Sequence, residues 1–330
     1  MNLSVRESWW VLLLSVLAAW PAYAVTVPNL YEASVPVTTG RDAAFVEALK
    51  AVAVRVSGRR DAAVRLGAAL NDPRQYVQRF GLTADNVLQV GFDSVSIDKL
   101  LGQADLPVWG RERPATLLLL QVEAPDGSSY WVDGGTTNAG ERDSIAKVAT
   151  LRGLPLVWPE LSPQDRDQLA AGGSSAALLQ IAARYSANAA LLGKARSDGA
   201  GGMSVHWTLA SSEGAAEASG SIEDGVHLAA DTFARVYSTS GTSLDSVTVE
   251  ISGIDDLNAY ATMLNYLEGM TLVRDVAVEQ VLGATMRFKL AVRGDAGTLQ
   301  RALALDGRLV PVQAADGAAL PGRLQFRYQP

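Results

Sequence analysis

Three residues in the segment Leu106–Leu120, which reads LPVWGRERPATLLLL, have side chains suited to ligand binding: Trp109, Arg111 and Arg113. An indole ring offers an apolar platform, and a guanidinium group offers donors in a fork that matches carboxylates and phosphates. The alternative is a turn, in which Trp109 packs at the end of a core while Arg111 and Arg113 stay in solvent. We favour the turn, because two prolines and a glycine restrict the backbone between a predicted helix and a predicted buried strand.

Other patterns that could support catalysis are incomplete. Ser144 and Lys147 fit the S-x-x-K pattern of penicillin-recognising enzymes, but the S-D-N and K-T-G motifs that complete such a site are absent. The two histidines, His206 and His227, are far apart and share no neighbouring ligand at metal-binding spacing. The sequence has no P-loop, no dinucleotide-binding glycine motif, no H-E-x-x-H and no cysteine. We therefore predict no cofactor and no metal site, and favour a binding protein over an enzyme.

Paired acidic residues occur at Asp255–Asp256 and at Asp165 and Asp167. Both pairs stand at expected helix starts, where carboxylates accept hydrogen bonds from free N–H groups, so capping is the favoured role. An enzyme that acts on glycans through carboxylates remains an alternative. It would need two carboxyl groups about 5–9 Å apart across a cleft, one of them with a raised pKa.

The first 24 residues have the composition of an export signal. Arg6 precedes the apolar run Trp9–Trp20, and Ala22 and Ala24 form the A-x-A pattern that signal peptidase cleaves. We predict cleavage after Ala24 and a periplasmic protein. No later apolar block approaches the roughly 20 residues that span a bilayer, so the mature chain is expected to have no integral membrane segment. The net charge of −7 disfavours nucleic acid as a partner and leaves other envelope proteins as the expected partners.

The order of predicted elements indicates α/β and α+β folding in two or three small mixed-sheet domains. We place an N-terminal α/β domain at 25–114, a middle α/β domain at 115–240 and a C-terminal domain at 241–330. Residues 116–122, TLLLLQV, lack alternation, which is typical of a strand covered on both faces. A helix is expected over 138–153 with Ile145, Val148 and Leu151 inward. The polar segment 238–246 reads as a linker, and the β-α-β-β-α-β order that follows predicts a ferredoxin-like (split βαβ) domain.

Several phrases resemble a family of exported Gram-negative proteins known as domain of unknown function 2066. They are YEASVPV, RDAAFVEALKAVAVRVSG, DPRQYVQRF, FDSVSIDKLLGQADLPVWGRERPATLLLL and ARYSANAALLGKAR. The resemblance implies an exported protein and implies no activity, ligand or catalytic residue. The region around ARYSANAALLGKAR also resembles the N-terminal α/β domains of the translocation protein TolB, although Asn188 stands where an aspartate is usual in them.

These observations favour an exported periplasmic binding or accessory protein of the cell envelope, without enzymatic activity. One alternative is a periplasmic enzyme with an unrecognised carboxylate-based site acting on glycans. Another is a small-molecule-binding module with a pocket between the first and middle domains. The hypothesis of a binding protein is favoured because partner chains can add as strands to the sheet edges of small α/β domains.

Overall fold

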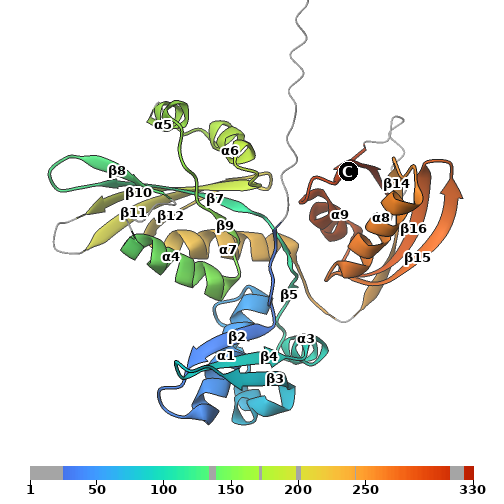
Figure 1. The fold of residues 1–330 in the computed structure, drawn as a ribbon, viewed down its shortest axis with the longest axis horizontal. Coiled ribbons are helices and arrows are strands. Elements are labelled where there is room, and N and C mark those ends of the chain that lie inside the picture. Colours follow the sequence, from blue (N-terminus) through green and yellow to red (C-terminus); the bar gives the residue numbers. More distant parts are fainter. Residues whose placement is uncertain (1–24, 134–138, 171–172, 198–201, 242, 313–322) are drawn as a thin grey trace, which may run out of the picture.

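The computed structural model describes residues 25–133, 139–170, 173–197, 202–241, 243–312 and 323–330. The predicted signal peptide lies outside these residues. The α/β and α+β class is confirmed: helices pack on three larger mixed or antiparallel sheets (Figure 1). We call each of these sheets, together with the helices on it, the N-terminal, middle or C-terminal module. The domain boundaries at 114 and 240 stay predictions.

The N-terminal module is an antiparallel sheet covered on one face by a long helix. Its strands are β2 (Glu32–Pro36), β3 (Val77–Leu82) and β4 (Val87–Phe92), in the order β2-β4-β3. Its helices are α1 (Arg41–Ser57), α2 (Ala62–Arg65), α3 (Ser94–Gln103) and two 3-10 helices (Gly67–Asn71 and Pro73–Tyr76). Helix α1 ends at Gly58, which has the left-handed conformation typical of a helix C-terminus. The other face of the sheet, which carries Ser34 and Gln89, borders a groove described below.

The middle module has a mixed sheet with helices on both faces. Its strands are β7 (Thr116–Glu123), β8 (Ser129–Val132), β9 (Leu156–Val157), β10 (Ala189–Ser197), β11 (Met203–Ser211) and β12 (Gly214–Gly220), ordered β12-β11-β10-β7-β8 with β9 also on β7. Helices α4 (Ala139–Arg152) and α7 (Asp224–Tyr237) cover one face, and α5 (Pro163–Ala170) and α6 (Ser175–Arg184) the other (Figure 1). Leu118 and Leu120 join the first core and Leu117 and Leu119 the second, so the prediction of a strand buried on both faces is confirmed.

Helix α4 buries a different face from the one its apolar residues predicted. Ile145 is buried, but Val148 is half-buried and Leu151 is 39% exposed. The buried positions are Ile145, Ala149 and Arg152, at i, i+4 and i+7. An arginine therefore occupies the inward position, and its side chain is stabilised there by the hydrogen bonds described below.

The C-terminal module contains the predicted β-α-β-β-α-β order with one added strand. Its elements are β14 (Leu244–Ser252), α8 (Leu257–Gly269), β15 (Val273–Leu282), β16 (Thr285–Arg293), α9 (Ala296–Ala304), β17 (Leu309–Pro311) and β18 (Arg323–Tyr328). The strand order is β15-β16-β14-β18-β17. Strand β18 runs parallel to β14 and antiparallel to β17, so it separates β17 from the rest of the sheet.

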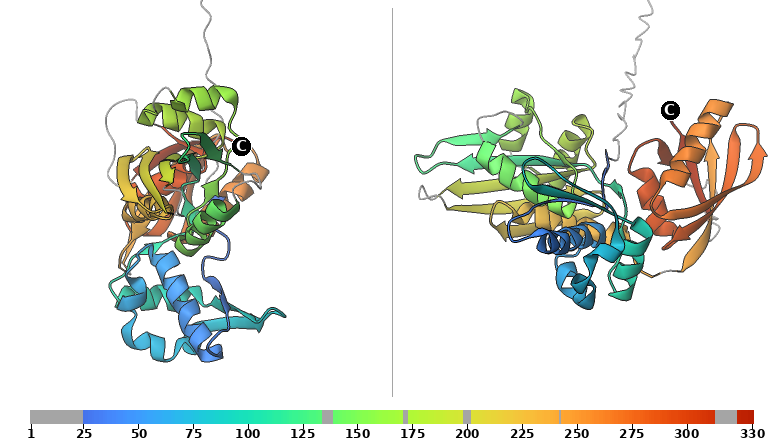
Figure 2. Two further views of the ribbon diagram at one scale, coloured as in Figure 1. Left: turned by 90° about the vertical axis from the view of Figure 1, so that its left-hand side faces the viewer. Right: turned by 60° about the horizontal axis from the view of Figure 1, so that its bottom comes forward.

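Two very short antiparallel sheets join the modules at the segment with which the sequence analysis began. Strand β5 (Val108–Trp109) pairs with β13 (Ser238–Thr239), which belongs to the predicted linker. Strand β6 (Glu112–Arg113) pairs with β1 (Val25–Thr26). The right-hand view of Figure 2 shows the N-terminal module (blue) and the C-terminal module (orange) on different sides of the middle module. Within the described ranges, no helix is both long and apolar enough to cross a membrane.

Candidate functional site

The tryptophan of the opening segment is a core residue. Trp109 has no exposed surface and belongs to the core that α4 and α7 form with the middle sheet. Its Nε1 has no hydrogen-bond acceptor within the described part of the chain. The turn interpretation therefore describes Trp109 correctly: the indole fills the end of a core and is not available to a surface ligand.

Arg113 is fully buried, so the prediction that it stays in solvent is wrong; Arg111 is exposed as expected. Arg113 can be buried because each of its side-chain N–H groups has a hydrogen-bond acceptor. The five N–H groups of Arg113 donate to five main-chain carbonyls, those of Trp109 (2.9 Å), Gly110 (2.8 Å), Arg55 (2.8 Å), Arg152 (2.9 Å) and Gly153 (2.9 Å). Desolvation, with a smaller contribution from the cation of Arg55, lowers the pKa of Arg113 to about 9.

Arg113 fastens the N-terminal module to the middle module. The carbonyl of Arg55 belongs to the last turn of α1, whereas those of Arg152 and Gly153 belong to the end of α4. One planar group thus sets the distance between two helix ends. We infer that the two modules form a preformed pair.

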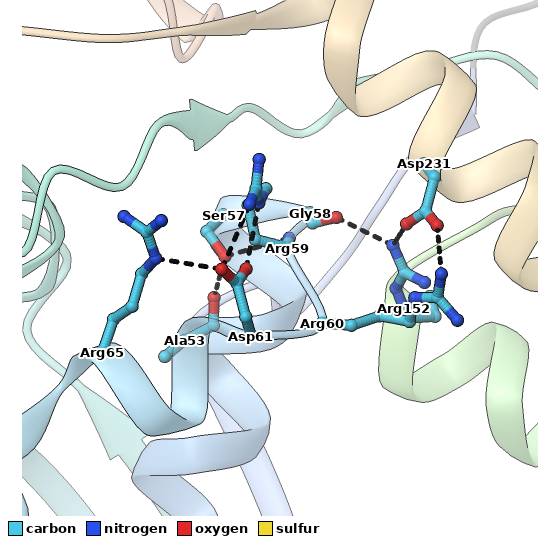
Figure 3. A network of polar contacts seen from close by, with 9 residues as sticks. All are labelled: Ala53, Ser57, Gly58, Arg59, Arg60, Asp61, Arg65, Arg152 and Asp231. Carbon is cyan, nitrogen blue, oxygen red and sulfur yellow. Dashed lines mark hydrogen bonds and ion pairs between the residues drawn. The ribbon is translucent and has the colours of Figure 1, made fainter.

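A second buried arginine strengthens the same junction (Figure 3). Arg152 donates to the carbonyl of Gly58 (2.7 Å) at the end of α1 and to Asp231 Oδ1 (2.5 Å) on α7. Its Nη1 lies 2.8 Å from His227 Nδ1, and Arg60 forms an ion pair with the same aspartate at 3.1 Å. Burial, and then the cations of Arg152 and Arg60, lower the pKa of His227. His227 is therefore part of a structural network.

The C-terminal module meets the other two through polar contacts. Asp98 Oδ2 on α3 accepts from Arg293 Nη1 (2.8 Å) and lies 3.4 Å from Arg274 Nη2, while Tyr31 donates to Asp98 Oδ1 (2.8 Å). Asn188, the residue that replaces the usual aspartate, accepts from the N–H of Ala115 (2.8 Å) and donates to the carbonyl of Leu305 (2.9 Å). An aspartate could not make the second bond while ionised.

A groove with a volume of about 940 Å³ lies between the N-terminal and middle modules. One wall is the sheet face opposite α1, with Ser34, Gln89 and Gly91. The other wall is α4, at Ala146 and Thr150, together with residues 153–156, which include the first residue of β9, and Trp158. Because Arg113 and Arg152 hold the ends of α1 and α4 together, this groove is built into the fold.

The groove has one aromatic side chain at its edge. Trp158, on the wall that faces the sheet, is half-buried. Phe80 on β3 is 61% exposed, but its ring makes an edge contact with Phe45 of α1 at a centroid distance of 5.4 Å, so the ring lies on the sheet face that α1 covers. An aromatic side chain beside a concave surface is typical of binding sites, since it buries much apolar area at a low cost in entropy.

An ion pair lies on the sheet wall. Glu32 of β2 bonds to Arg79 of β3, whose side chain crosses over Gly91 between them. A Cβ atom at Gly91 would lie 2.9 Å from Arg79 Cγ, so the glycine makes room for this crossing. Glu32 is the single carboxylate among the residues that line the groove.

Arg55 spans the floor of the groove, where the two walls converge. Its Nε donates to the carbonyl of Thr150 (3.0 Å) on α4, and its Nη1 donates to the carbonyls of Glu32 (2.5 Å) and Asn29 (3.4 Å). Among the residues described, none accepts a hydrogen bond from Nη2 or pairs with the charge, and Nη2 is not enclosed. Burial lowers the pKa of Arg55.

A smaller hollow of about 370 Å³ adjoins the groove. Both hollows are lined by Glu32, Arg79 and Gly91 of the sheet and by the segment 27–29. This segment is held by the N–H of Val27, which donates to the carbonyl of Arg111 (3.0 Å). Arg111 lines the smaller hollow, whereas Trp109 and Arg113 line neither of these two hollows.

The remaining sequence candidates have structural roles. Ser144, of the S-x-x-K match, donates to Glu223 and so joins α4 to the start of α7. Asp256 caps α8 by accepting from the N–H of Ala259 (2.7 Å), as predicted. His206 is exposed on β11. No group of three potential metal ligands occurs in the part of the chain that the structure describes.

Comparison with known families identifies one domain. Residues 24–110 match a family model described as a domain of unknown function (DUF8605). This region contains the N-terminal module, including the sheet wall of the groove. The match does not confirm the resemblance to family 2066 or to TolB, and no curated protein matches the chain.

Proposed function

We propose that the protein is a non-enzymatic binding protein of the bacterial periplasm that holds an extended polypeptide segment of an envelope partner. The observation that carries this proposal is the groove between the N-terminal and middle modules. It has sheet and helix walls, the half-buried indole of Trp158 at its edge, and the polar groups of Ser34, Gln89 and Thr150 along its length. Such a mixed lining suits a chain that offers both side chains and peptide groups.

Two further features support the proposal. The junction made by Arg113 and Arg152 fixes the walls before a ligand arrives, and such preorganisation reduces the entropy lost on binding. The predicted signal sequence and the resemblance to exported family 2066 support a periplasmic location. Export can be tested by measuring the intact mass of the mature protein, which is expected to begin at Val25.

A carboxylate-based glycosidase has less support from the groove. Retaining and inverting glycosidases both use two carboxyl groups that flank the bond to be cleaved. Among the residues lining the groove, Glu32 is the single carboxylate and is paired with Arg79. One observation favours the small-molecule alternative. The groove lies between the N-terminal and middle modules, and that alternative placed its pocket between the first and middle domains.

Site-specific photocrosslinking in living cells tests the proposal. A photoreactive amino acid at Gln89, on the groove wall, is expected to give defined protein adducts. The matched control is Glu217, an exposed residue of β12 in the middle module that does not line the groove. Equal adducts at both positions, or none at Gln89, would contradict the proposal. A metabolite that co-purifies with the protein in place of adducts would establish the small-molecule alternative.

A further inference from the structure

The floor of the groove carries a positive charge that no acidic group in the described part of the chain balances. Glu32, the carboxylate of the lining, is already paired with Arg79, so Arg55 lacks an anionic partner. Arg113 adds a second cation beneath the floor, bonded to carbonyls and touching the groove residue Gly153. In a chain whose net charge is −7, this is a local reversal of sign. Two guanidinium groups in a partly desolvated place favour an anion there.

Arg55 is held in position for such an anion. Its bonds to the carbonyls of Thr150, Glu32 and Asn29 use Nε and Nη1 and fix the plane of the guanidinium group. The two N–H groups of Nη2 remain available, and they lie on a group that has lost its rotational freedom. A fixed guanidinium binds a carboxylate at a smaller entropic cost than a flexible lysine would.

The strand beside Arg55 has an open edge. In the antiparallel pair of β2 and β4, the N–H of Phe92 donates to the carbonyl of Tyr31, and alternation then pairs Ala33 and Val35 with β4. Ser34 therefore directs its N–H and C=O away from β4, and it lines the groove. Pro36 has no N–H, which limits the open edge to a short stretch around Ser34.

The open edge of β2 ends at Glu32. The N–H of Glu32 donates to the carbonyl of Asn29 (3.0 Å), and the same carbonyl accepts from Arg55 Nη1 (3.4 Å). A chain that lies along β2 toward Glu32 therefore meets the guanidinium group at the point where Asn29 closes the edge, which forms a wall. A polypeptide that ends at this point places its terminal carboxylate beside Nη2.

We propose that Arg55 binds the free carboxyl terminus of an extended polypeptide, which adds to the open edge of β2 at Ser34. The bound chain runs antiparallel to β2, because β2 leads away from the wall as it passes from Glu32 to Pro36. This proposal rests on the proposed function and specifies its ligand class. Strand addition supplies affinity through main-chain hydrogen bonds, and the carboxylate supplies the selection for chain ends.

The test compares two pools of random-sequence, N-acetylated decapeptides, one with a free carboxyl terminus and one with a carboxamide. The immobilised mature protein is expected to retain the free-acid pool at least about tenfold better, the equivalent of one charge-assisted hydrogen bond. Equal retention of both pools overturns the carboxylate proposal and leaves polypeptide binding standing. Retention of neither pool overturns both.

Three variants test the residues. Arg55→Gln is expected to abolish the difference between the pools, and Ser34→Pro, which removes an outward N–H, to weaken retention of both pools. Arg74→Gln is the matched control, because it removes a cation of the same module that already has a carboxylate partner, Asp42, and does not line the groove. Loss of selectivity in Arg74→Gln but not in Arg55→Gln would overturn the proposal. Should Arg55→Gln unfold, the wild-type pools and Ser34→Pro still decide the question.

Discussion

Arg113 lies against the face of Trp109, with its Cζ 3.8 Å from the centroid of the indole ring, and also donates to the main-chain carbonyl of that residue. The cation and the ring are both fully buried. This pairing explains why the segment around Trp109 and Arg113, whose charged residues are typical of a protein surface, contributes to the interior of the molecule. The indole ring covers one face of the guanidinium group. Five carbonyls accept hydrogen bonds from the N–H groups at the edge of that group.

The first prediction concerns the five carbonyls around Arg113. Arg113→Lys is expected to destabilise the protein strongly, because a lysine has three donors and lacks the planar fork. Each buried carbonyl left without a donor costs about 1–3 kcal/mol. Urea unfolding followed by near-ultraviolet circular dichroism measures the loss.

Arg111→Lys is the control for this experiment, since Arg111 is two residues away and exposed. Its effect is expected to stay within about 0.5 kcal/mol, as for most surface substitutions. If the two variants were equally stable, the hydrogen-bond network would not hold the modules together.

The second prediction concerns Gly153, which lies against Arg113. Gly153 has a φ of +62°, and a Cβ atom there would lie 2.5 Å from Arg113 Nη1. Gly153→Ala is expected to pay both the backbone strain of the left-handed conformation, about 1–2 kcal/mol, and the displacement of Arg113. Gly127→Ala separates the two costs, because Gly127 also has a positive φ (+84°) but has open space at the Cβ position. Thermal unfolding should show a clearly larger loss of stability for Gly153→Ala than for Gly127→Ala. Equal losses would mean that Arg113 moves aside without a measurable cost.

Much of the fold follows from local patterns, whereas the junction does not. Helix α1 and strand β7 were predictable because their apolar residues repeat with a recognisable period, or without interruption. Burial of Arg113 and Arg152 was not predictable, because their acceptors come from residues 55, 58, 110 and 153, which the sequence does not show to be near one another. In α4, periodicity alone placed Leu151 inward, where Arg152 is found.

A pocket between the first and middle domains was one of the alternatives from the sequence, but the residues that form the groove could not be identified, for a similar reason. Its walls come from residues 27–34, 79–91 and 146–158. From the sequence, Arg55 is a basic residue in the last turn of a helix, where a favourable interaction with the helix dipole is expected. Only the approach of Thr150 shows that it spans a groove. Likewise, nothing local indicates that β18 inserts between β14 and β17.

The third prediction concerns pH. In the folded protein, burial and the cations of Arg152 and Arg60 lower the pKa of His227 from 6.5, and these effects outweigh the opposing carboxylates of Asp231 and Asp224. The unfolded chain therefore binds a proton at a higher pH than the folded chain does. The stability that neutral His227 contributes is full above about pH 6.5 and declines as the pH falls toward the folded-state pKa.

The measurement is the free energy of unfolding between pH 7.5 and 5. It is expected to fall less steeply in His227→Gln than in the wild type, because glutamine does not titrate. His206→Gln is the control, since His206 is exposed. A wild-type slope that is preserved in His227→Gln would assign the pH dependence to other groups.

The fourth prediction concerns Asn188, which joins the middle module to the C-terminal module. In Asn188→Asp the new carboxylate keeps the bond from the N–H of Ala115 but cannot donate to the carbonyl of Leu305. An unpaired carbonyl facing a carboxylate costs at least about 1–3 kcal/mol at neutral pH. The loss should shrink at acidic pH, where the protonated group can donate again. Urea unfolding at pH 7 and pH 4 measures both effects.

Asn258→Asp provides the matched control, because Asn258 is exposed in the first turn of α8. There, a negative charge interacts favourably with the helix dipole, so this variant is expected to be neutral or slightly more stable. The same chemical change thus has opposite expected signs at two positions. A loss at Asn188 no larger than that at Asn258 would show that the bond to Leu305 does not hold the C-terminal module in place.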